Sequence, residues 1–151
     1  MNTDHYLLTG DEMLPVYYFI SQGSKGNIKK GVFFQLIDEE RKLFNLAFGD
    51  WDESTSNLDD LARTNNYDTQ KVLNTVAIAV LDFMDKNPDA RLFAKGSTES
   101  RTRLYQINIR KNIVEISREY VVEGFRNGCW EAFEKNVNYE GFLLIRRLLT
   151  L

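Results

Sequence analysis

One segment, residues 69–86, limits the fold more than any other part of this chain. Its sequence is TQKVLNTVAIAVLDFMDK, and its apolar residues recur every three or four positions, which is typical of an α-helix. Asn87-Pro88 ends the pattern, because a residue that precedes proline avoids helical backbone angles. The apolar stripe is broad and contains Val72, Leu73, Val76, Ala77, Ala79, Val80, Leu81, Phe83 and Met84. A stripe this wide predicts a helix packed deeply on a β-sheet.

Three strand-like runs precede that helix. Residues 16–20 (VYYFI), 28–38 (IKKGVFFQLID) and 43–51 (LFNLAFGDW) are rich in aromatic and β-branched side chains. We expect them to form an antiparallel meander. The stretch 50–68 is polar and acidic, and we expect a loop there with one helical turn at residues 58–63.

The chain after the helix is harder to interpret. Residues 91–95 (RLFAK) and 119–126 (EYVVEGFR) predict two short strands. Between them, residues 100–118 carry apolar side chains at both helical and strand spacing. We favour a helix, because capping residues precede this stretch and it is long for a strand. Residues 142–149 fit either a last strand or a short helix.

The resulting order β-β-β-α-β-α-β predicts an α+β fold. We expect a mostly antiparallel sheet with two main helices packed on one face, in a single domain over residues 1–151. A chain of this length can bury a substantial core, and 13% of its residues are aromatic.

Charge argues against an extended nucleic-acid surface, because the formal net charge is −3 and nucleic-acid binders usually have a basic surplus. The charge is also unevenly spread. Residues 50–68 hold six acids and one base, whereas residues 86–118 hold eight bases and three acids. We expect these regions to neutralise each other within the fold or across a homodimer.

The single cysteine, Cys129, cannot form an internal disulfide. The chain has neither a recognisable signal sequence nor about 18 consecutive apolar residues. We therefore expect a cytoplasmic protein without a membrane partner.

Several chemistries have no support in the residues. His5 and Cys129 are the only histidine and cysteine, so an ordinary zinc site cannot be built within one chain. A histidine-assisted nucleophile would have to use His5, near the start of the sequence, and we do not favour it. Glycine fingerprints for nucleotide phosphates are missing. The acids that start at Asp50 resemble a calcium loop, but Leu61 stands where that loop needs a glutamate. We expect no metal, no cofactor and no catalytic residue, and we favour binding over catalysis.

The segment 95–105, KGSTESRTRLY, is the strongest candidate for a ligand site. It places a glycine and two hydroxyl residues where a strand is expected to become a helix, and the first amides of a helix suit anions. Arginine side chains can grip a phosphate with two hydrogen bonds. The candidate ligand-binding residues are Lys95, Ser97, Thr98, Arg101, Arg103 and Tyr105.

Other readings of this segment stay open. In a purely structural reading, Ser97 or Thr98 only caps the helix and the arginines pair with the acids of residues 50–68. A partner protein with an acidic surface could take the place of the small anionic ligand. A phosphodiesterase without histidine, such as a toxin-like ribonuclease, would use the arginines and Tyr105. A homo-oligomeric interaction protein would instead use the aromatic residues of 17–20.

The same segment carries a resemblance to a family. Gly96, Ser97 and the run 101–105 (RTRLY) match a Gly-Ser-x-x-x-Arg-Thr-Arg-Leu-Tyr core. With the downstream YEGFLLIRR, the chain resembles an uncharacterised family of bacterial proteins of about this length, over most of its residues. The resemblance implies no activity.

Overall fold

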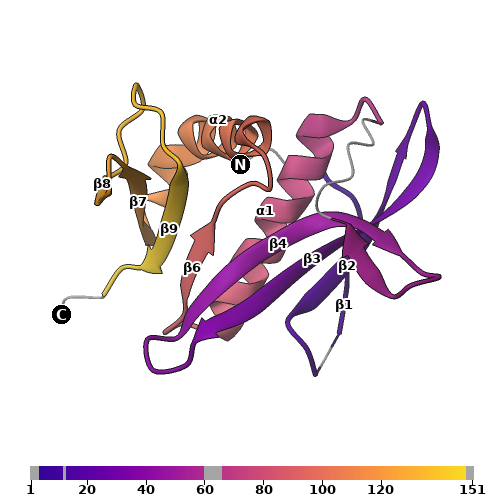
Figure 1. Ribbon diagram of the computed structural model, residues 1–151, viewed down its shortest axis with the longest axis horizontal. Helices are drawn as coiled ribbons and strands as arrows, with labels where there is room; N and C mark the ends of the chain where they lie inside the picture. Colours follow the sequence, from indigo (N-terminus) through magenta and orange to yellow (C-terminus); the bar gives the residue numbers. More distant parts are fainter. Residues whose placement is uncertain (1–3, 12, 60–65, 149–151) are drawn as a thin grey trace. The chain divides into compact units, whose positions relative to one another are not determined.

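The computed structural model describes residues 4–11, 13–59 and 66–148. Within them, nine strands and two helices follow one another in the order β1–β5, α1, β6, α2 and β7–β9 (Figure 1). The strands pair mostly antiparallel, so the predicted α+β class is confirmed. The predicted element order is wrong in detail, because β1, β5 and β8 have only two to four residues each and are too short to show a strand pattern.

The elements have the following bounds. The strands are β1 (Thr9–Gly10), β2 (Val16–Gly23), β3 (Gly26–Asp38), β4 (Leu43–Asp52), β5 (Asn57–Asp59), β6 (Arg91–Ala94), β7 (Tyr120–Arg126), β8 (Cys129–Ala132) and β9 (Gly141–Arg146). The helices are α1 (Thr69–Lys86) and α2 (Glu99–Ile116). Neither described helix has the length and apolar content that a membrane span requires.

The described chain divides into two compact units. Unit 1 contains residues 36–45 and 87–148, and unit 2 contains residues 4–35 and 46–86. Each unit has buried apolar residues and a helix of its own. The expectation of a single domain over residues 1–151 stays a prediction.

Unit 2 is a meander covered by α1. Strands β2 and β3 form an antiparallel hairpin in which Val16 lies opposite Phe33, and α1 lies along this part of the sheet (Figure 1). The ring of Phe83 on α1 stacks on Phe34 with a centroid distance of 4.1 Å. Both the meander of three long strands and the helix over residues 69–86 are confirmed. The broad apolar stripe explains why this helix forms here, because its buried residues supply the packing surface. They are Val72, Leu73, Val76, Ala79, Phe83 and Met84.

Only some side chains of strand β2 are accessible to another protein chain. Tyr17 and Phe19 point into the core and are buried, whereas Tyr18 is half-buried and Ile20 is exposed. The alternation of a β-strand accounts for this difference. Of the residues 17–20 proposed as self-association contacts, only Tyr18 and Ile20 lie on the accessible face.

A buried ion pair interrupts the apolar face of the meander. Lys30 shares its face of β3 with the buried residues Val32 and Phe34, and its ammonium group bonds to the carboxylate of Asp50 on β4. The side chains of Lys30 and Asp50 are only 7% and 17% exposed. The pair therefore sits in surroundings where neither charge is well solvated.

The acidic stretch is only partly the loop that the sequence predicts. Its start belongs to β4, and residues 57–59 form β5, with Trp51 opposite Leu58 in the ladder. The loop prediction is wrong for these residues, because the backbone of β4 offers hydrogen bonds to β5 whatever the side chains are. The helical turn predicted at 58–63 is wrong at residues 58–59 and otherwise lies outside the described residues.

A carboxylate on α1 makes the stability of unit 2 depend on pH. The hydroxyl of Tyr17 donates to Asp82 at 2.5 Å, and Lys86 donates to it at 3.0 Å; these bonds lower the pKa of Asp82. A lowered pKa means that the carboxylate stabilises the fold above its ordinary pKa of about 4, and that this contribution is lost as the pH falls through the folded-state value.

We therefore expect the free energy of unfolding, measured with urea between about pH 5 and 2, to fall less steeply in Tyr17→Phe than in the wild type. Tyr18→Phe is the control, because that hydroxyl lies on the opposite face. Equal slopes in all three proteins would contradict a stabilising role for the Tyr17–Asp82 bond.

Unit 1 holds a second antiparallel sheet segment, in the order β6-β9-β7-β8, with α2 next to β7. Asn127 and Gly128 join β7 to β8 with positive φ angles of 52° and 76°, as a tight two-residue hairpin requires. The helix preferred for residues 100–118 is confirmed as α2. For residues 142–149 the sequence allows a strand or a short helix, and the structure has a strand there, β9, over residues 141–146. The core contains Ala90, Leu92, Tyr120, Val122, Tyr139 and Phe142.

Candidate functional site

The segment from β6 to α2 is a tight turn fixed by two threonines. Thr98 is the N-cap of α2, and its hydroxyl oxygen accepts a bond from the amide of Arg101 at 3.2 Å. The hydroxyl of Thr102 accepts from the Gly96 amide at 3.0 Å and donates to the carbonyl of Thr98 at 3.2 Å. The strand end and the first turn of the helix are thus held together by side chains of the helix itself.

Gly96 is required here by a close approach. A Cβ atom at this position would lie 2.4 Å from the amide nitrogen of Thr102 and 2.5 Å from Cβ of Arg101. These atoms belong to the first turn of α2 and cannot move without moving the helix. Only glycine lets the chain pass this close to the helix end.

A loop before β9 faces this turn, and Gln106 holds it in place. The side-chain amide of Gln106 donates to the carbonyl of Val137, and its oxygen accepts from the amide of Tyr139 at 2.9 Å. Gln106 is only 3% exposed, so both bonds are shielded from water. The loop is therefore anchored to the middle of α2.

Tyr139 is anchored at both ends. Its ring is buried, its hydroxyl accepts from the amide of Glu134 at 3.0 Å, and it lies 3.2 Å from the carboxylate of Glu131. Burial raises the pKa of the Tyr139 hydroxyl; the bond from Glu134 opposes this rise, and the charge of Glu131 adds to it. Tyr139 is therefore a neutral structural residue at physiological pH.

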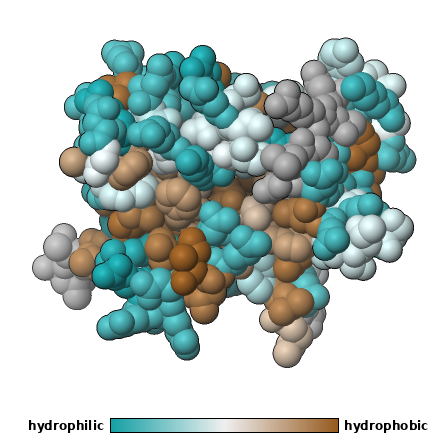
Figure 2. All heavy atoms as spheres, viewed as in Figure 1, coloured by the Kyte–Doolittle hydropathy of each residue, from teal (hydrophilic) through white to brown (hydrophobic). Residues whose placement is uncertain are grey.

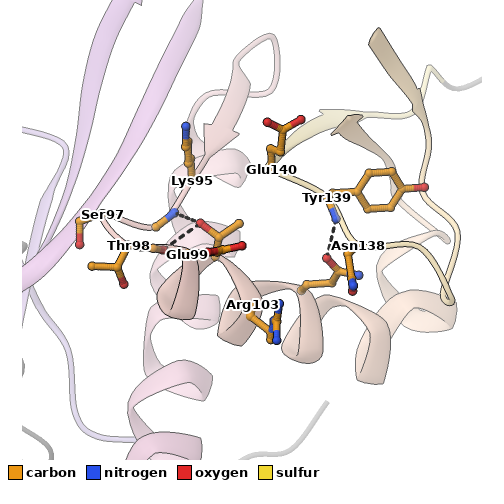
Figure 3. Close-up of a pocket in the computed structure, with 11 residues that line it drawn as sticks. Lys95, Ser97, Thr98, Glu99, Arg103, Asn138, Tyr139 and Glu140 are labelled. Atoms are coloured by element: carbon orange, nitrogen blue, oxygen red, sulfur yellow. Dashed lines mark hydrogen bonds between the residues drawn. The ribbon is translucent and has the colours of Figure 1, made fainter. Parts of the chain in front are cut away.

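Between the turn and the loop lies a pocket of about 370 Å³ (Figure 3). Lys95, directly after β6, stands across from Glu140. Arg103 lies further along α2, and Asn138 lies in the facing loop before β9. The lining residues are Lys95, Gly96, Ser97, Thr98, Glu99, Thr102, Arg103, Gln106, Asn138, Tyr139 and Glu140. The pocket thus offers two cations, two carboxylates and several neutral polar groups.

The structure brings together four of the six residues predicted to bind a ligand. Lys95, Ser97, Thr98 and Arg103 line the pocket. Arg101 and Tyr105 do not line it; the guanidinium of Arg101 lies 3.5 Å from the hydroxyl of Ser97, and Tyr105 is half-buried. A role in ligand binding stays a prediction for all six.

The sequence pattern does not reveal the residues of the opposite wall of the pocket. Gln106, Asn138, Tyr139 and Glu140 carry no local pattern that separates them from ordinary polar residues. The distance of more than thirty residues between Gln106 and the loop explains why, since the contact exists only in the folded chain. Residues 139–142 (YEGF) stand out in the sequence only through the family resemblance.

Metal chemistry receives no support from the described part of the chain. No group of three or more histidine, cysteine, aspartate or glutamate side chains is close enough there to hold a metal ion. Cys129 is exposed at the start of β8. The indole ring of the neighbouring Trp130 contacts Phe93 and Phe125.

The fold and the pocket together define a small α+β protein with a polar site at a strand-to-helix turn. A family model described as a family of unknown function, DUF6934, matches residues 2–147, and the chain belongs to this family. The resemblance to an uncharacterised family is thereby confirmed at this level, while the shared core around Gly96 and the bacterial source stay predictions. The curated proteins provide no match to the chain. No solved structure matches it either.

Proposed function

We propose that the protein is a binding module for a small phosphate-bearing ligand, held in the pocket at the start of α2. The observation that carries the proposal is the arrangement of Lys95, Arg103 and the N-terminal end of α2 around one space of about 370 Å³. This volume falls in the range of small-molecule sites.

The electrostatics of the turn favour an anionic group. Thr98 satisfies the amide of Arg101, whereas the amides of Glu99 and Ser100 have no acceptor among the described residues. The exposed amides and the helix dipole attract negative charge. Lys95 and Arg103 have no ion-pair partner in the described ranges, so their charges are available to a ligand.

The two carboxylates narrow the class of ligand. Glu99 and Glu140 are acceptors and would repel a ligand that carries negative charge at every edge. A ligand with one phosphate and several hydroxyl or amino donors suits both ends of the pocket. Sugar phosphates and nucleoside monophosphates have this combination.

The test is a thermal-shift and calorimetric screen of the wild type against ribose 5-phosphate, nucleoside monophosphates, inorganic phosphate and unphosphorylated ribose. A phosphorylated ligand at about a hundred times its Kd is expected to stabilise the wild type by about 2.7 kcal/mol. Ribose is expected to have no effect. In Lys95→Ala/Arg103→Ala we expect the affinity to fall at least about tenfold, because two charge-assisted contacts are lost.

Arg110→Ala/Lys111→Ala is the matched control, since it removes the same charge from α2 outside the pocket. Equal affinities in the two double variants would contradict the proposal, as would a wild type that binds none of the phosphates. The ligand is expected to be recovered unchanged. Its cleavage would favour the phosphodiesterase reading instead.

A further inference from the structure

The solvent face of α2 carries an unusual set of side chains. Successive residues of a helix are about 100° apart, which places six exposed residues within about 100° of its circumference. They are Arg103, Ile107, Arg110, Lys111, Val114 and Arg118, the last of which continues the turn just past the helix end. We call this set the basic stripe. It is about 22 Å long, because a helix rises about 1.5 Å per residue.

The cations of the basic stripe have no acidic partners in the described part of the chain. Elsewhere the pattern differs: Lys42 lies 3.3 Å from Asp89, and Arg126 lies 2.7 Å from Glu131. In Figure 2 the surface over α2 is mainly hydrophilic, with small hydrophobic areas between. A protein with a net charge of −3 therefore concentrates unpaired positive charge on one helix face.

Two apolar residues lie among these cations. Ile107 is 47% exposed and Val114 is 68% exposed, although both are large enough to favour burial. They are seven positions apart, so they project from the same face at a spacing of about 10 Å. This is the spacing at which helical segments anchor apolar side chains on a partner.

We propose that the basic stripe of α2 is a docking surface for an acidic protein segment that also carries apolar side chains. The cations select negative charge by complementarity, and protein interfaces are enriched in arginine. Ile107 and Val114 select apolar side chains, which a phosphate backbone does not offer. A membrane surface fits less well, because helices that lie on membranes present large apolar side chains along a whole face.

Of the basic stripe, only Arg103 also lines the pocket. The test is independent of the proposed pocket function, because it changes Arg110, Lys111 and Val114, which do not line it. The probe is a labelled synthetic helical peptide of the length of α2, with leucines at positions i, i+3 and i+7 and glutamates beside them. A peptide with lysines in place of the glutamates is its control. Binding to the full chain is followed by fluorescence anisotropy at two salt concentrations.

We expect the acidic peptide to bind the wild type, more weakly at high salt. In Arg110→Glu/Lys111→Glu the affinity is expected to fall about tenfold, because two attractions become repulsions. Val114→Ser is expected to weaken binding about fivefold. Lys25→Glu/Lys135→Glu reverses two exposed charges away from the stripe and is expected to change the affinity less than about twofold.

Because all these positions are exposed, each variant should melt at the temperature of the wild type. The proposal is overturned if the stripe variant and the Lys25/Lys135 variant bind the acidic peptide equally well. It is also overturned if a DNA duplex or vesicles of phosphatidylserine and phosphatidylcholine bind more tightly than the peptide and depend on the same residues. In that case the basic stripe serves a nucleic acid or a membrane.

Discussion

Asp50→Asn is expected to reduce the free energy of unfolding by about 3–5 kcal/mol, as measured by urea denaturation. The substitution keeps the shape of the side chain but leaves the ammonium of Lys30 without its counter-charge, in a position where only 7% of that side chain is exposed. An uncompensated buried charge is among the most destabilising changes that a point substitution can make.

The neighbouring ion pair provides the control. Lys29 and Glu53 also join β3 to the end of the β4 segment, but their side chains are 33% and 69% exposed. Glu53→Gln is expected to have a much smaller effect, since water solvates Lys29 when its partner is lost. Replacing both buried partners, in Lys30→Met/Asp50→Leu, is expected to recover most of the stability lost in Asp50→Asn. Similar losses in Asp50→Asn and Glu53→Gln would contradict this account.

The second large effect is expected at Gly124 on β7. A Cβ atom there would lie 2.4 Å from two atoms of the Tyr139 ring, which is buried and held by hydrogen bonds at both ends. Gly124→Ala is therefore expected to destabilise the protein by about 3 kcal/mol, at the upper end of the effects of overpacking. Because Tyr139 lines the pocket, affinity for a phosphorylated ligand should fall in the same variant.

Gly10→Ala is the matched change in another strand, where the added carbon would meet Tyr17 at an ordinary 3.5 Å. It is expected to change the stability by less than about 1 kcal/mol. A double-mutant cycle identifies the cause: Gly124→Ala should be less destabilising in a Tyr139→Ala background, where the ring is gone. Strictly additive effects would show that the ring of Tyr139 is not what excludes a side chain at position 124.

Parts of this fold could be predicted from the sequence because the signal was local. The apolar stripe of α1 extends over eighteen residues, and Thr98 marks the start of α2 as an N-cap. Short strands gave no such signal. Strand β8 has four residues, of which three are exposed, and it exists because the tight turn at Asn127-Gly128 folds it back on β7.

The position of Lys30 shows a different limit. Alternation along β3 places residue 30 on the buried face, but a lysine at that position reads as a solvent-facing residue in any hydropathy pattern. A lysine can be buried there only because Asp50 on β4 neutralises its charge, and Asp50 is twenty residues away in the sequence. Pairwise compensation of this kind cannot be recognised from either residue alone.

The candidate site likewise has one part that the local sequence predicts and one part that it does not. The turn at residues 95–98 was predictable because a glycine and hydroxyl residues before a helix have a local physical meaning. The facing loop was not, because Gln106 positions it through contacts with backbone atoms 31 and 33 residues away. Arg101 lies in the same motif but does not line the pocket, because the helix places its guanidinium 3.5 Å from the hydroxyl of Ser97.

The way Gln106 holds the loop has a consequence for how relatives of this protein can diverge. Both of its hydrogen bonds end on main-chain atoms of residues 137 and 139, so they make no demand on the side chains at 138 and 140. Asn138 and Glu140 can therefore be exchanged for other residues while the wall of the pocket keeps its position. Evolution can alter the side chains that line the pocket without rebuilding the frame that shapes it.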